Sequence, residues 1–296
     1  MKILNFGSLN IDYVYSVDHF VRPGETIFSK SLHPFCGGKG LNQSVAIARA
    51  GACVYHAGKV GKGSEMLIEA LKSSGVLIEN ILKTDGVSGH TIIQVDKSGQ
   101  NSIALFGGAN HEIDNRFVIS VMKPFKRNDI LLLQNEINNV PYIMQRAHKK
   151  GMKIAFNPSP FSRELLSYPL EYVNWFILNE IEGKEITGES DPKKIADALL
   201  ERYPSCAVVL TLGKNGVYYK DTKTELSHGI YAVKAVDTTG VGDTFTGYFL
   251  AGEVRKVDIK ENLRIASIAS SIAVSRNGAA NSIPCIQEVL NSKLKL

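Results

Sequence analysis

The stretch Gly240-Val-Gly-Asp-Thr-Phe-Thr-Gly247 holds residues that could act together on an anionic substrate. Its first two glycines let the main chain turn sharply and approach a ligand closely. The small, weakly polar residues that follow indicate a helix, whose free N–H groups and positive dipole end attract an anion. An acidic residue at the mouth of such a site repels the anion, so the presence of Asp243 needs an explanation.

Asp243 has two interpretations. It could accept the proton of a hydroxyl group that attacks a phosphoryl group held by those N–H groups. Alternatively, it could do no more than cap the helix, as aspartate often does. These eight residues alone favour the cap, and the decision rests on the remainder of the chain.

A second glycine-rich turn, Gly37-Gly-Lys-Gly40, follows a predicted strand and opens a predicted helix that contains Asn42 and Gln43. Adjacent glycines expose backbone donors, and Lys39 and Asn42 lie three residues apart on one helical face. Recognition of a polyol needs this mixture of donors and acceptors. A plain turn from strand to helix explains the glycines equally well.

Polar residues follow three successive predicted strands. Glu136 comes after the apolar run that begins at Leu131, Asn157 ends the next strand, and Asn179 with Glu182 follows the one after. The carboxyl ends of parallel strands meet at one edge of a sheet, which is where ligands bind. Asn179 and Glu182 can share one helical face toward a metal–phosphate group. Capping of a surface helix is the alternative for this pair.

Weaker signals lie at three further positions. Asn10 and Asp12 offer acceptors for hydroxyl groups, although each alone is more typical of a turn. Thr211-Leu-Gly213 ends a strand before the turn at Asn215-Gly216, and this tight turn could accept a nucleotide. The oxygen atoms of Asp237-Thr-Thr239, directly before the first motif, could coordinate a cation beside the anion site.

Two nucleotide-binding fingerprints are incomplete. Gly58-Lys-Val-Gly-Lys-Gly-Ser64 resembles a Walker motif, but His56 stands where its first glycine is required. Neither Gly7 nor Gly240 begins a complete Gly-x-Gly-x-x-Gly. The sequence therefore argues against a P-loop enzyme and against a nucleotide-dependent dehydrogenase.

The elements that must position these residues alternate between strand and helix. Apolar runs predict buried strands at Lys2–Phe6, Ile130–Leu133, Met152–Phe156, Trp175–Leu178 and Ala207–Leu212. Capping and terminal signals predict helices at Glu65–Ser74, at Pro141–Lys150 and from Asp191-Pro192 onward. This rhythm predicts an α/β fold with a mostly parallel, doubly wound sheet and helices on both faces.

Two pairs of β segments break the rhythm. His90–Asp96 and Asn101–Gly107 form one pair, and Ile11–Val17 and Thr26–Phe35, joined by a turn at Pro23-Gly24, form the other. Neither pair has a crossover helix, so both are predicted to form a small separate sheet. Such a sheet would serve as a lid or a dimer contact. Edge hairpins of the main sheet are the alternative.

The composition of the chain limits the classes of function that it can have. The chain has 296 residues, 44% of them hydrophobic and 21% charged, which is typical of an ordinary soluble α/β domain. Lys and Arg exceed Asp and Glu by five, but they are spread thinly, so nucleic acid is not an expected partner. Four scattered cysteines argue against a zinc site and a disulfide framework. With no signal peptide or membrane-spanning run, the protein is expected in the cytoplasm.

Together these residues resemble the ribokinase-like (PfkB) family of carbohydrate kinases, and within it most closely the ribokinases. The likeness runs from Gly7-Ser-Leu-Asn-Ile-Asp12 through Pro23-Gly-Glu-Thr26 to Ser282, and its diagnostic stretches are Gly37–Asn42 and Asp237–Phe245. The resemblance implies one ribokinase-like kinase domain over residues 1–296, with a β lid formed by about 11–36 and 88–108 inserted in it.

The resemblance also implies an activity, the ATP-dependent phosphorylation of a sugar hydroxyl, with D-ribose converted to ribose 5-phosphate as the leading hypothesis. Asp243 matches the general base, and the anion hole matches Gly240, Val241 and Gly242. The sugar-binding positions match Asn10, Asp12, Gly38, Lys39, Asn42 and Glu136. The nucleotide-binding positions match Asn179, Glu182, Thr211, Gly213, Gly216 and Gly242.

Metal sites and a partner follow from the same resemblance. Asn179 and Glu182 match an element that organises Mg²⁺ and phosphate, with Glu182 acting on the metal indirectly. Potassium, a monovalent cation, is expected at the positions that match Asp237, Thr239, Val274, Arg276, Gly278 and Ser282. In ribokinases the lid also makes a homodimer, so a second copy of the chain is an expected partner.

Other substrates on the same fold are the alternatives: fructose, 2-keto-3-deoxygluconate or a nucleoside. The N-terminal likeness and the Asn10/Asp12 pair favour ribose over the keto acid. A non-catalytic sugar-sensing protein is a more distant alternative, because such a protein should have lost the base or the anion-hole glycines, and both are intact.

Overall fold

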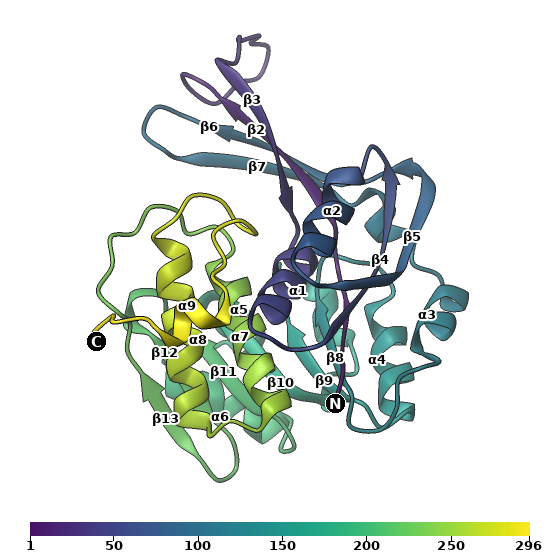
Figure 1. Ribbon diagram of the computed structural model, residues 1–296, viewed down its shortest axis with the longest axis vertical. Coiled ribbons are helices and arrows are strands. Elements are labelled where there is room, and N and C mark those ends of the chain that lie inside the picture. The colour runs from purple at the N-terminus through teal and green to yellow at the C-terminus, as the bar shows by residue number, and fades with distance from the viewer.

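Two β-sheets of different size make up the protein (Figure 1). The computed structural model describes all residues 1–296. The larger sheet has nine strands in the order β13-β12-β11-β10-β9-β8-β1-β4-β5, and the smaller has four in the order β3-β2-β6-β7. The strands of the larger sheet are β1 (Ile3–Phe6), β4 (Val54–Lys62), β5 (Leu77–Val87), β8 (Ile130–Gln134), β9 (Lys153–Asn157), β10 (Val173–Asn179), β11 (Ala207–Thr211), β12 (Val217–Lys220) and β13 (Glu225–His228). Those of the smaller sheet are β2 (Asn10–Ser16), β3 (Ser31–Gly37), β6 (Gly89–Val95) and β7 (Asn101–Phe106).

Helices connect the strands of the larger sheet. The α-helices are α1 (Lys39–Arg49), α2 (Glu65–Ser73), α3 (Asn115–Met122), α4 (Val140–Lys149), α5 (Glu180–Thr187), α6 (Pro192–Arg202), α7 (Val241–Arg255), α8 (Ile259–Val274) and α9 (Ile286–Leu290). Short 3-10 helices lie at Gly108–His111, Arg163–Ser167, Leu170–Tyr172 and Gly213–Asn215. None of the helices is long and apolar enough to cross a membrane.

The larger sheet is parallel from β5 to β11, and only the pairings of β11 with β12 and of β12 with β13 are antiparallel. Consecutive residues of one strand enter different cores, because side chains alternate between the two faces of a sheet. One core contains Ile3, Leu132, Ile177 and Val209 under α1, α2, α7 and α8. The other contains Leu4, Leu131, Phe176 and Leu210 under α3, α4, α5 and α6. The predicted doubly wound architecture with helices on both faces is confirmed.

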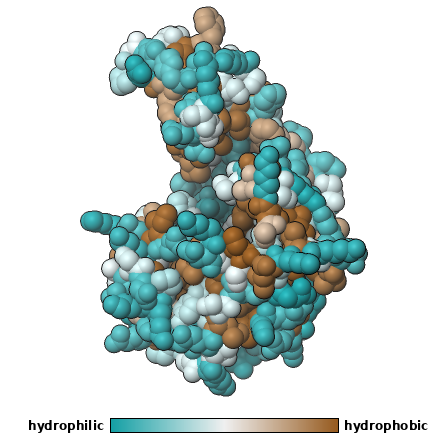
Figure 2. Space-filling view, turned by 90° about the vertical axis from the view of Figure 1, so that its left-hand side faces the viewer, coloured by the Kyte–Doolittle hydropathy of each residue, from teal (hydrophilic) through white to brown (hydrophobic).

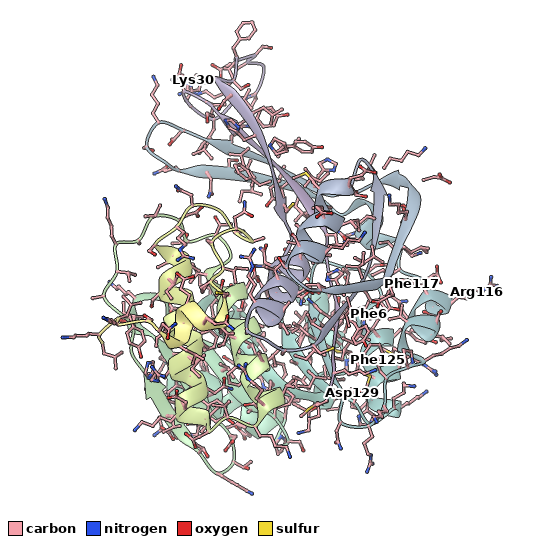
Figure 3. The ribbon with its side chains drawn as sticks, in the orientation of Figure 1. Phe6, Lys30, Arg116, Phe117, Phe125 and Asp129 are labelled. Carbon is pink, nitrogen blue, oxygen red and sulfur yellow. The ribbon has the colours of Figure 1, made fainter.

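Aromatic contacts close the core on the α3 side. The rings of Phe6 and Phe117 meet edge to face with centroids 5.8 Å apart (Figure 3). The rings of Tyr55 and Phe125 do so with centroids 5.3 Å apart. Such pairs add to the free energy gained from burial alone. These rings therefore belong to the packed core on this face. The polar residues singled out in the sequence lie elsewhere, at the carboxyl edge of the sheet, at the starts of α1 and α7 and at the base of the smaller sheet.

The smaller sheet rises above the body of the protein, and the molecule narrows between the two (Figures 1 and 2). Strands β2 and β3 pair antiparallel, as do β6 and β7, while β2 and β6 pair in parallel. The prediction of a small separate sheet is confirmed, and the alternative of edge hairpins on the main sheet is wrong.

One predicted strand boundary is wrong. Strand β3 begins at Ser31 and not at Thr26, because its partner β2 ends at Ser16, the residue opposite Ser31. Helix α8 ends at Val274, before the candidate cation residues Arg276, Gly278 and Ser282. The carbonyl of Val274 instead accepts the N–H groups of residues 236 and 237, at 2.8 Å and 3.2 Å, so it is not available to continue the helix.

Candidate active site

Asp243 lies in the first turn of α7, which begins after Gly240. Its side chain is 8% exposed and makes no capping hydrogen bond. Instead, Oδ2 accepts from Nδ2 of Asn42 at 3.0 Å and Oδ1 accepts from Nε2 of Gln43 at 2.8 Å. The interpretation of Asp243 as a helix cap is therefore wrong, because its carboxylate is turned toward α1.

The amide groups at the start of α7 are free to bind an anion. The N–H groups of Gly242 and Asp243 donate to no acceptor of the protein. A Cβ added at Gly242 would meet nothing within 4 Å, so this side of the turn is open. Gly240 has φ of 71°, a left-handed conformation that favours glycine, and a Cβ there would press on Ala279 at 3.2 Å. The turn thus needs glycine and presents unpaired donors at a helix N-terminus.

A polar cleft opens at this helix start, where the carboxyl ends of β9, β10 and β11 meet. It is lined by Lys39, Asn157, Ser159, Ile177, Leu178, Asn179, Glu182, Thr211, Thr238, Gly240, Gly242, Asp243 and Thr246. Residues from α1, three strands and α7 therefore face one space, as expected for a parallel sheet. Gly213 and Gly216 lie beyond this lining. At Gly216 the added Cβ would overlap the carbonyl of His228, so this glycine is required by the approach of β13.

Asn179 and Glu182 both cap α5 and line the cleft. Oδ1 of Asn179 accepts the N–H groups of Ile181 and Glu182, each at 2.9 Å, and Oε2 of Glu182 accepts the N–H of Asn179 at 3.0 Å. The capping alternative describes these contacts correctly. Glu182 lines the cleft, and its second carboxylate oxygen, Oε1, accepts no hydrogen bond from the protein.

Lys39 is a cation surrounded by carboxylates. Burial disfavours its charge, but the carboxylates of Asp243, Glu136 and Glu182 outweigh burial and raise the pKa of Lys39. Its backbone N–H donates to Oε2 of Glu136 at 2.9 Å, and the hydroxyl of Ser8 donates to the same oxygen. Burial raises the pKa of Glu136, an effect that Lys39 and Ser8 oppose. The result is a positive side chain next to the open amides of α7.

The sugar-binding candidates from the N-terminus lie at the base of the smaller sheet. Asn10 and Asp12 begin β2, so neither forms the turn that each suggests alone. Oδ1 of Asp12 accepts from the hydroxyl of Thr91 at 2.6 Å, while burial raises the pKa of Asp12. A Cβ at Gly38 would lie 3.1 Å from the backbone nitrogen of Asn10, which brings the second glycine turn against this pair.

Asn110 is a residue that the sequence reasoning missed. Its Nδ2 donates to Oδ1 of Asn10 at 2.7 Å, and its Oδ1 accepts the N–H of Leu9 at 2.9 Å. The oxygen of Asn10 thus already accepts one hydrogen bond within the protein, while its NH₂ group donates to no protein acceptor. An asparagine directly after Gly107-Gly-Ala, just past the end of strand β7, was the available signal.

The candidate potassium residues are brought together only in part. Oδ1 of Asp237 accepts from the N–H and hydroxyl of Thr239, and Oδ2 accepts the N–H of Gly278 at 2.9 Å. Burial opposes the charge of Asp237, but these hydrogen bonds prevail and lower its pKa. The side chain of Arg276 pairs with Glu288 instead, and the hydroxyl of Ser282 donates to the carbonyl of residue 279. The side chains of Arg276 and Ser282 thus make hydrogen bonds to groups other than Asp237 and Thr239.

Comparison with known proteins identifies the family. The pfkB family of carbohydrate kinases matches residues 1–286. Ribokinases of Haemophilus influenzae and Schizosaccharomyces pombe are 35% and 36% identical to the chain, and the alignments cover 96% and 98% of it and 95% and 96% of them. A structure of Arabidopsis thaliana ribokinase complexed with ribose and ATP has a TM-score of 0.85 at 28% identity, covering 98% of this chain and 97% of that one. The chain therefore belongs to the pfkB family of carbohydrate kinases and is a sugar kinase, a phosphotransferase.

Proposed function

We propose that this kinase phosphorylates the terminal hydroxyl of D-ribose to form ribose 5-phosphate, with ATP as the phosphate donor and Asp243 as the general base. The observation that carries the proposal is the carboxylate of Asp243, held by two amides of α1 beside unpaired N–H groups of α7. The relatives named ribokinase, and the Arabidopsis protein with ribose and ATP, support ribose as the acceptor.

Asp243 can act as a base because α1 fixes the position of its carboxylate. Each oxygen of Asp243 accepts one hydrogen bond from α1, which fixes the carboxylate plane and leaves further lone pairs for a hydroxyl of the sugar. As that hydroxyl attacks the γ-phosphorus, its proton passes to Asp243, the new O–P bond forms, and the bond to ADP breaks. Lys39 and the free amides of Gly242 and Asp243 stabilise the charge on the transferred phosphoryl group.

The sugar would be held by complementary donors and acceptors. Asn10 supplies N–H donors, and Asp12 and Glu136 supply carboxylate acceptors. A site that hydrogen-bonds hydroxyl groups in this way rejects a sugar that lacks them, because the buried polar groups are then left without partners. We propose that the smaller sheet acts as the lid over this sugar, because Asp12 extends from its strand β2.

ATP and a divalent metal are implied by the family. The polar cleft with Thr211 at the end of β11 fits the nucleotide, with Gly213 and Gly216 in the adjoining turn. No group of three or more His, Cys, Asp or Glu side chains could hold a metal, which fits Mg²⁺ carried by phosphates and water, with Glu182 acting through water. The metal would neutralise phosphate charge.

We propose that K⁺ binds beside Asp237 and Thr239, together with main-chain oxygens of residues 274–282.

A panel of acceptors tests the function. With ATP, Mg²⁺ and K⁺ present, we expect kcat/KM for D-ribose to exceed that for fructose, 2-keto-3-deoxygluconate and a nucleoside by at least about 100-fold, since buried polar groups left unpaired by a wrong substrate can supply discrimination on the order of 10⁴–10⁵. Phosphorus NMR of the product should show phosphate on the 5-hydroxyl, and replacing K⁺ by Li⁺ should lower turnover. A higher kcat/KM for another acceptor would transfer the assignment to it, and no turnover with any acceptor would favour a sugar sensor.

We also propose that the smaller sheet pairs with a second copy of the chain. Apolar side chains are exposed on both of its faces: Ile92 and Phe106 on one, and Ile103 and Leu105 on the face that carries Asp12, at 45–56%. The face that carries Asp12 can cover the sugar. The exposed apolar side chains of the opposite face then need another partner to shield them from water. Sedimentation velocity should show a dimer that Phe106→Glu converts to monomer. A monomer at every concentration of the unaltered chain would contradict the pairing.

A further inference from the structure

Five polar side chains lie buried in the apolar layer between the larger sheet and helices α1 and α7. They are Asn5, Gln43, Ser44, His56 and Gln134, and each is at most 1% exposed. Burying polar groups costs free energy unless they are hydrogen-bonded, so this buried polar network calls for a reason. It ends directly on Asp243, through Gln43.

Three amides form the centre of the buried polar network. Nε2 of Gln134 donates both to Oε1 of Gln43 at 2.6 Å and to Oδ1 of Asn5 at 3.0 Å. Nδ2 of Asn5 donates to the carbonyl of Gly40 at 2.8 Å and to the hydroxyl of Ser44 at 2.8 Å. These residues come from β1, α1 and β8, so the network ties the helix that carries Gln43 to two central strands.

The two ends of the network determine how every amide is oriented. The carboxylate of Asp243 and the carbonyl of Gly40 can only accept, so Gln43 and Asn5 must each turn an NH₂ group toward them. Both amides then direct their oxygens at Gln134, whose single NH₂ group supplies one hydrogen to each. Reversing any one amide would oppose donor to donor or acceptor to acceptor. Gln43 is thus held with its donor toward Asp243.

The far end of the network is uncharged. Nδ1 of His56 lies 2.8 Å from the hydroxyl of Ser44. Burial lowers the pKa of His56 to about 4, with the Gly7 carbonyl opposing the shift, so the ring is neutral near pH 7. The network therefore places no positive charge beside Asp243 that would disfavour protonation of its carboxylate. The carboxylate is oriented by neutral donors alone along this side.

We propose that Gln43 is a positioning residue for the catalytic base: oriented by Gln134 and Asn5, it holds the carboxylate of Asp243 at the angle needed to take a proton from the sugar. The proposal rests on the proposed function, because it assigns a role relative to that base. A displacement of about 1 Å in a reacting group can cost on the order of 10² in rate. Gln43 should therefore affect turnover far more than binding.

Two variants of nearly native shape separate this role from packing. Gln43→Met removes the donor, and we expect kcat to fall by roughly 10- to 100-fold with KM for ribose and ATP within about threefold of native. Gln43→Glu keeps the oxygen that accepts from Gln134 but sets a second carboxylate against Asp243. Because two adjacent carboxylates resist joint ionisation, the acidic limb of the pH profile of kcat should move up by about one unit or more.

Controls distinguish a failure of this inference from a failure of the proposed function. Asn262→Leu removes another buried amide, which donates to the carbonyl of Phe249, midway along α7 and away from Asp243, and should lower stability without moving the pH profile. In an Asp243→Asn background, Gln43→Met should cause no further loss of kcat. A native kcat for Gln43→Met, or an unshifted profile for Gln43→Glu, overturns the inference if Asp243→Asn is inactive. An active Asp243→Asn overturns the general base itself.

Discussion

Replacing Asp243 with asparagine should lower kcat by about 10²–10⁴, the range for loss of a general acid or base, while sugar and ATP still bind. The variant should fold, because the new amide fits the same space. Oδ1 of Asn42 has no partner in the native protein, so the Asn42 amide can turn and accept from the NH₂ group at position 243. Gln43 can continue to donate to the remaining oxygen. Only the ability to take a proton is lost.

A coupled assay of ADP release, together with calorimetric titration of ribose and an ATP analogue, measures the two halves of this result. Asp258→Asn is the matched control, since Asp258 caps α8 through the N–H of Lys260 at 3.0 Å and is exposed. It makes the same chemical change away from the cleft and should leave turnover unaltered. Near-native turnover for Asp243→Asn would remove the assignment of this residue as the base.

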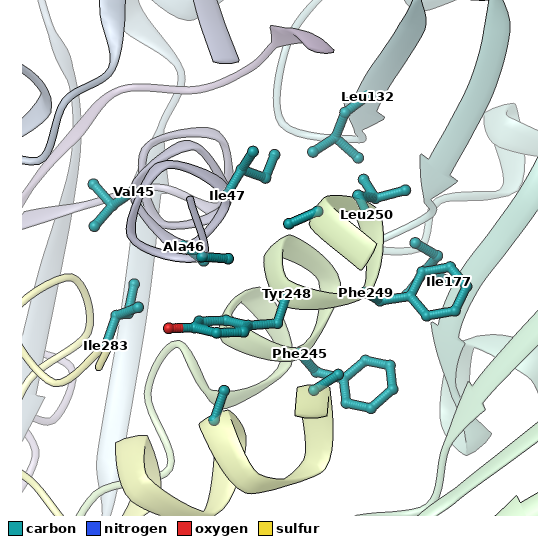
Figure 4. Packing of buried hydrophobic residues seen from close by; sticks show 14 of the residues in the cluster. Val45, Ala46, Ile47, Leu132, Ile177, Phe245, Tyr248, Phe249, Leu250 and Ile283 are labelled. Atoms are coloured by element: carbon teal, nitrogen blue, oxygen red, sulfur yellow. The ribbon is translucent and has the colours of Figure 1, made fainter. Parts of the chain in front are cut away.

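Replacing Gly247 with alanine should destabilise the protein by roughly 1–3 kcal/mol and reduce kcat at least tenfold. Gly247 lies one helical turn after Asp243, where α7 crosses α1. A Cβ at this position would overlap the side chain of Ala46 and lie 2.8 Å from the backbone nitrogen of Ile47. These neighbours are fully buried and packed beside Tyr248, so α1 has no room to yield (Figure 4).

The sign of this effect is informative, because alanine is the better helix former by about 1 kcal/mol and would stabilise an unobstructed helix. Pushing α1 away from α7 would also lengthen the hydrogen bond from Gln43 to Asp243, which explains the expected loss of activity. Urea unfolding and kcat measure the two effects. Gly229→Ala is the control, since its Cβ would meet only Leu296 at 3.4 Å. A native midpoint for Gly247→Ala would contradict the close helix contact.

Much of the fold could be predicted from the sequence because buried parallel strands read as continuous apolar runs. The strands at Ile130–Gln134 and Ala207–Thr211 are of this kind, and β4 is not. Strand β4 carries His56 and Lys59 beside two glycines and was not predicted. Lys59 is buried, with Nζ donating to the carbonyl of Glu112 at 2.6 Å and to Asp114 at 3.1 Å. Hydrogen-bond partners more than 50 residues away in the chain compensate for burying the ammonium group of Lys59 in the sheet.

The sequence by itself determined the parts of the site that are local. The glycines at 240 and 242, the start of α7 and the turn at Gly37-Gly38 follow from backbone freedom and helix termini, which involve only neighbouring residues.

Only the tertiary structure decided what Asp243 contacts, that Asn110 donates to Asn10, and that Gln134 donates to both Asn5 and Gln43. The partners in these hydrogen bonds are 91 to 201 residues apart. An amide or carboxylate accepts or donates according to which group is placed opposite it, and the packing of α1, α7 and the central strands determines that placement.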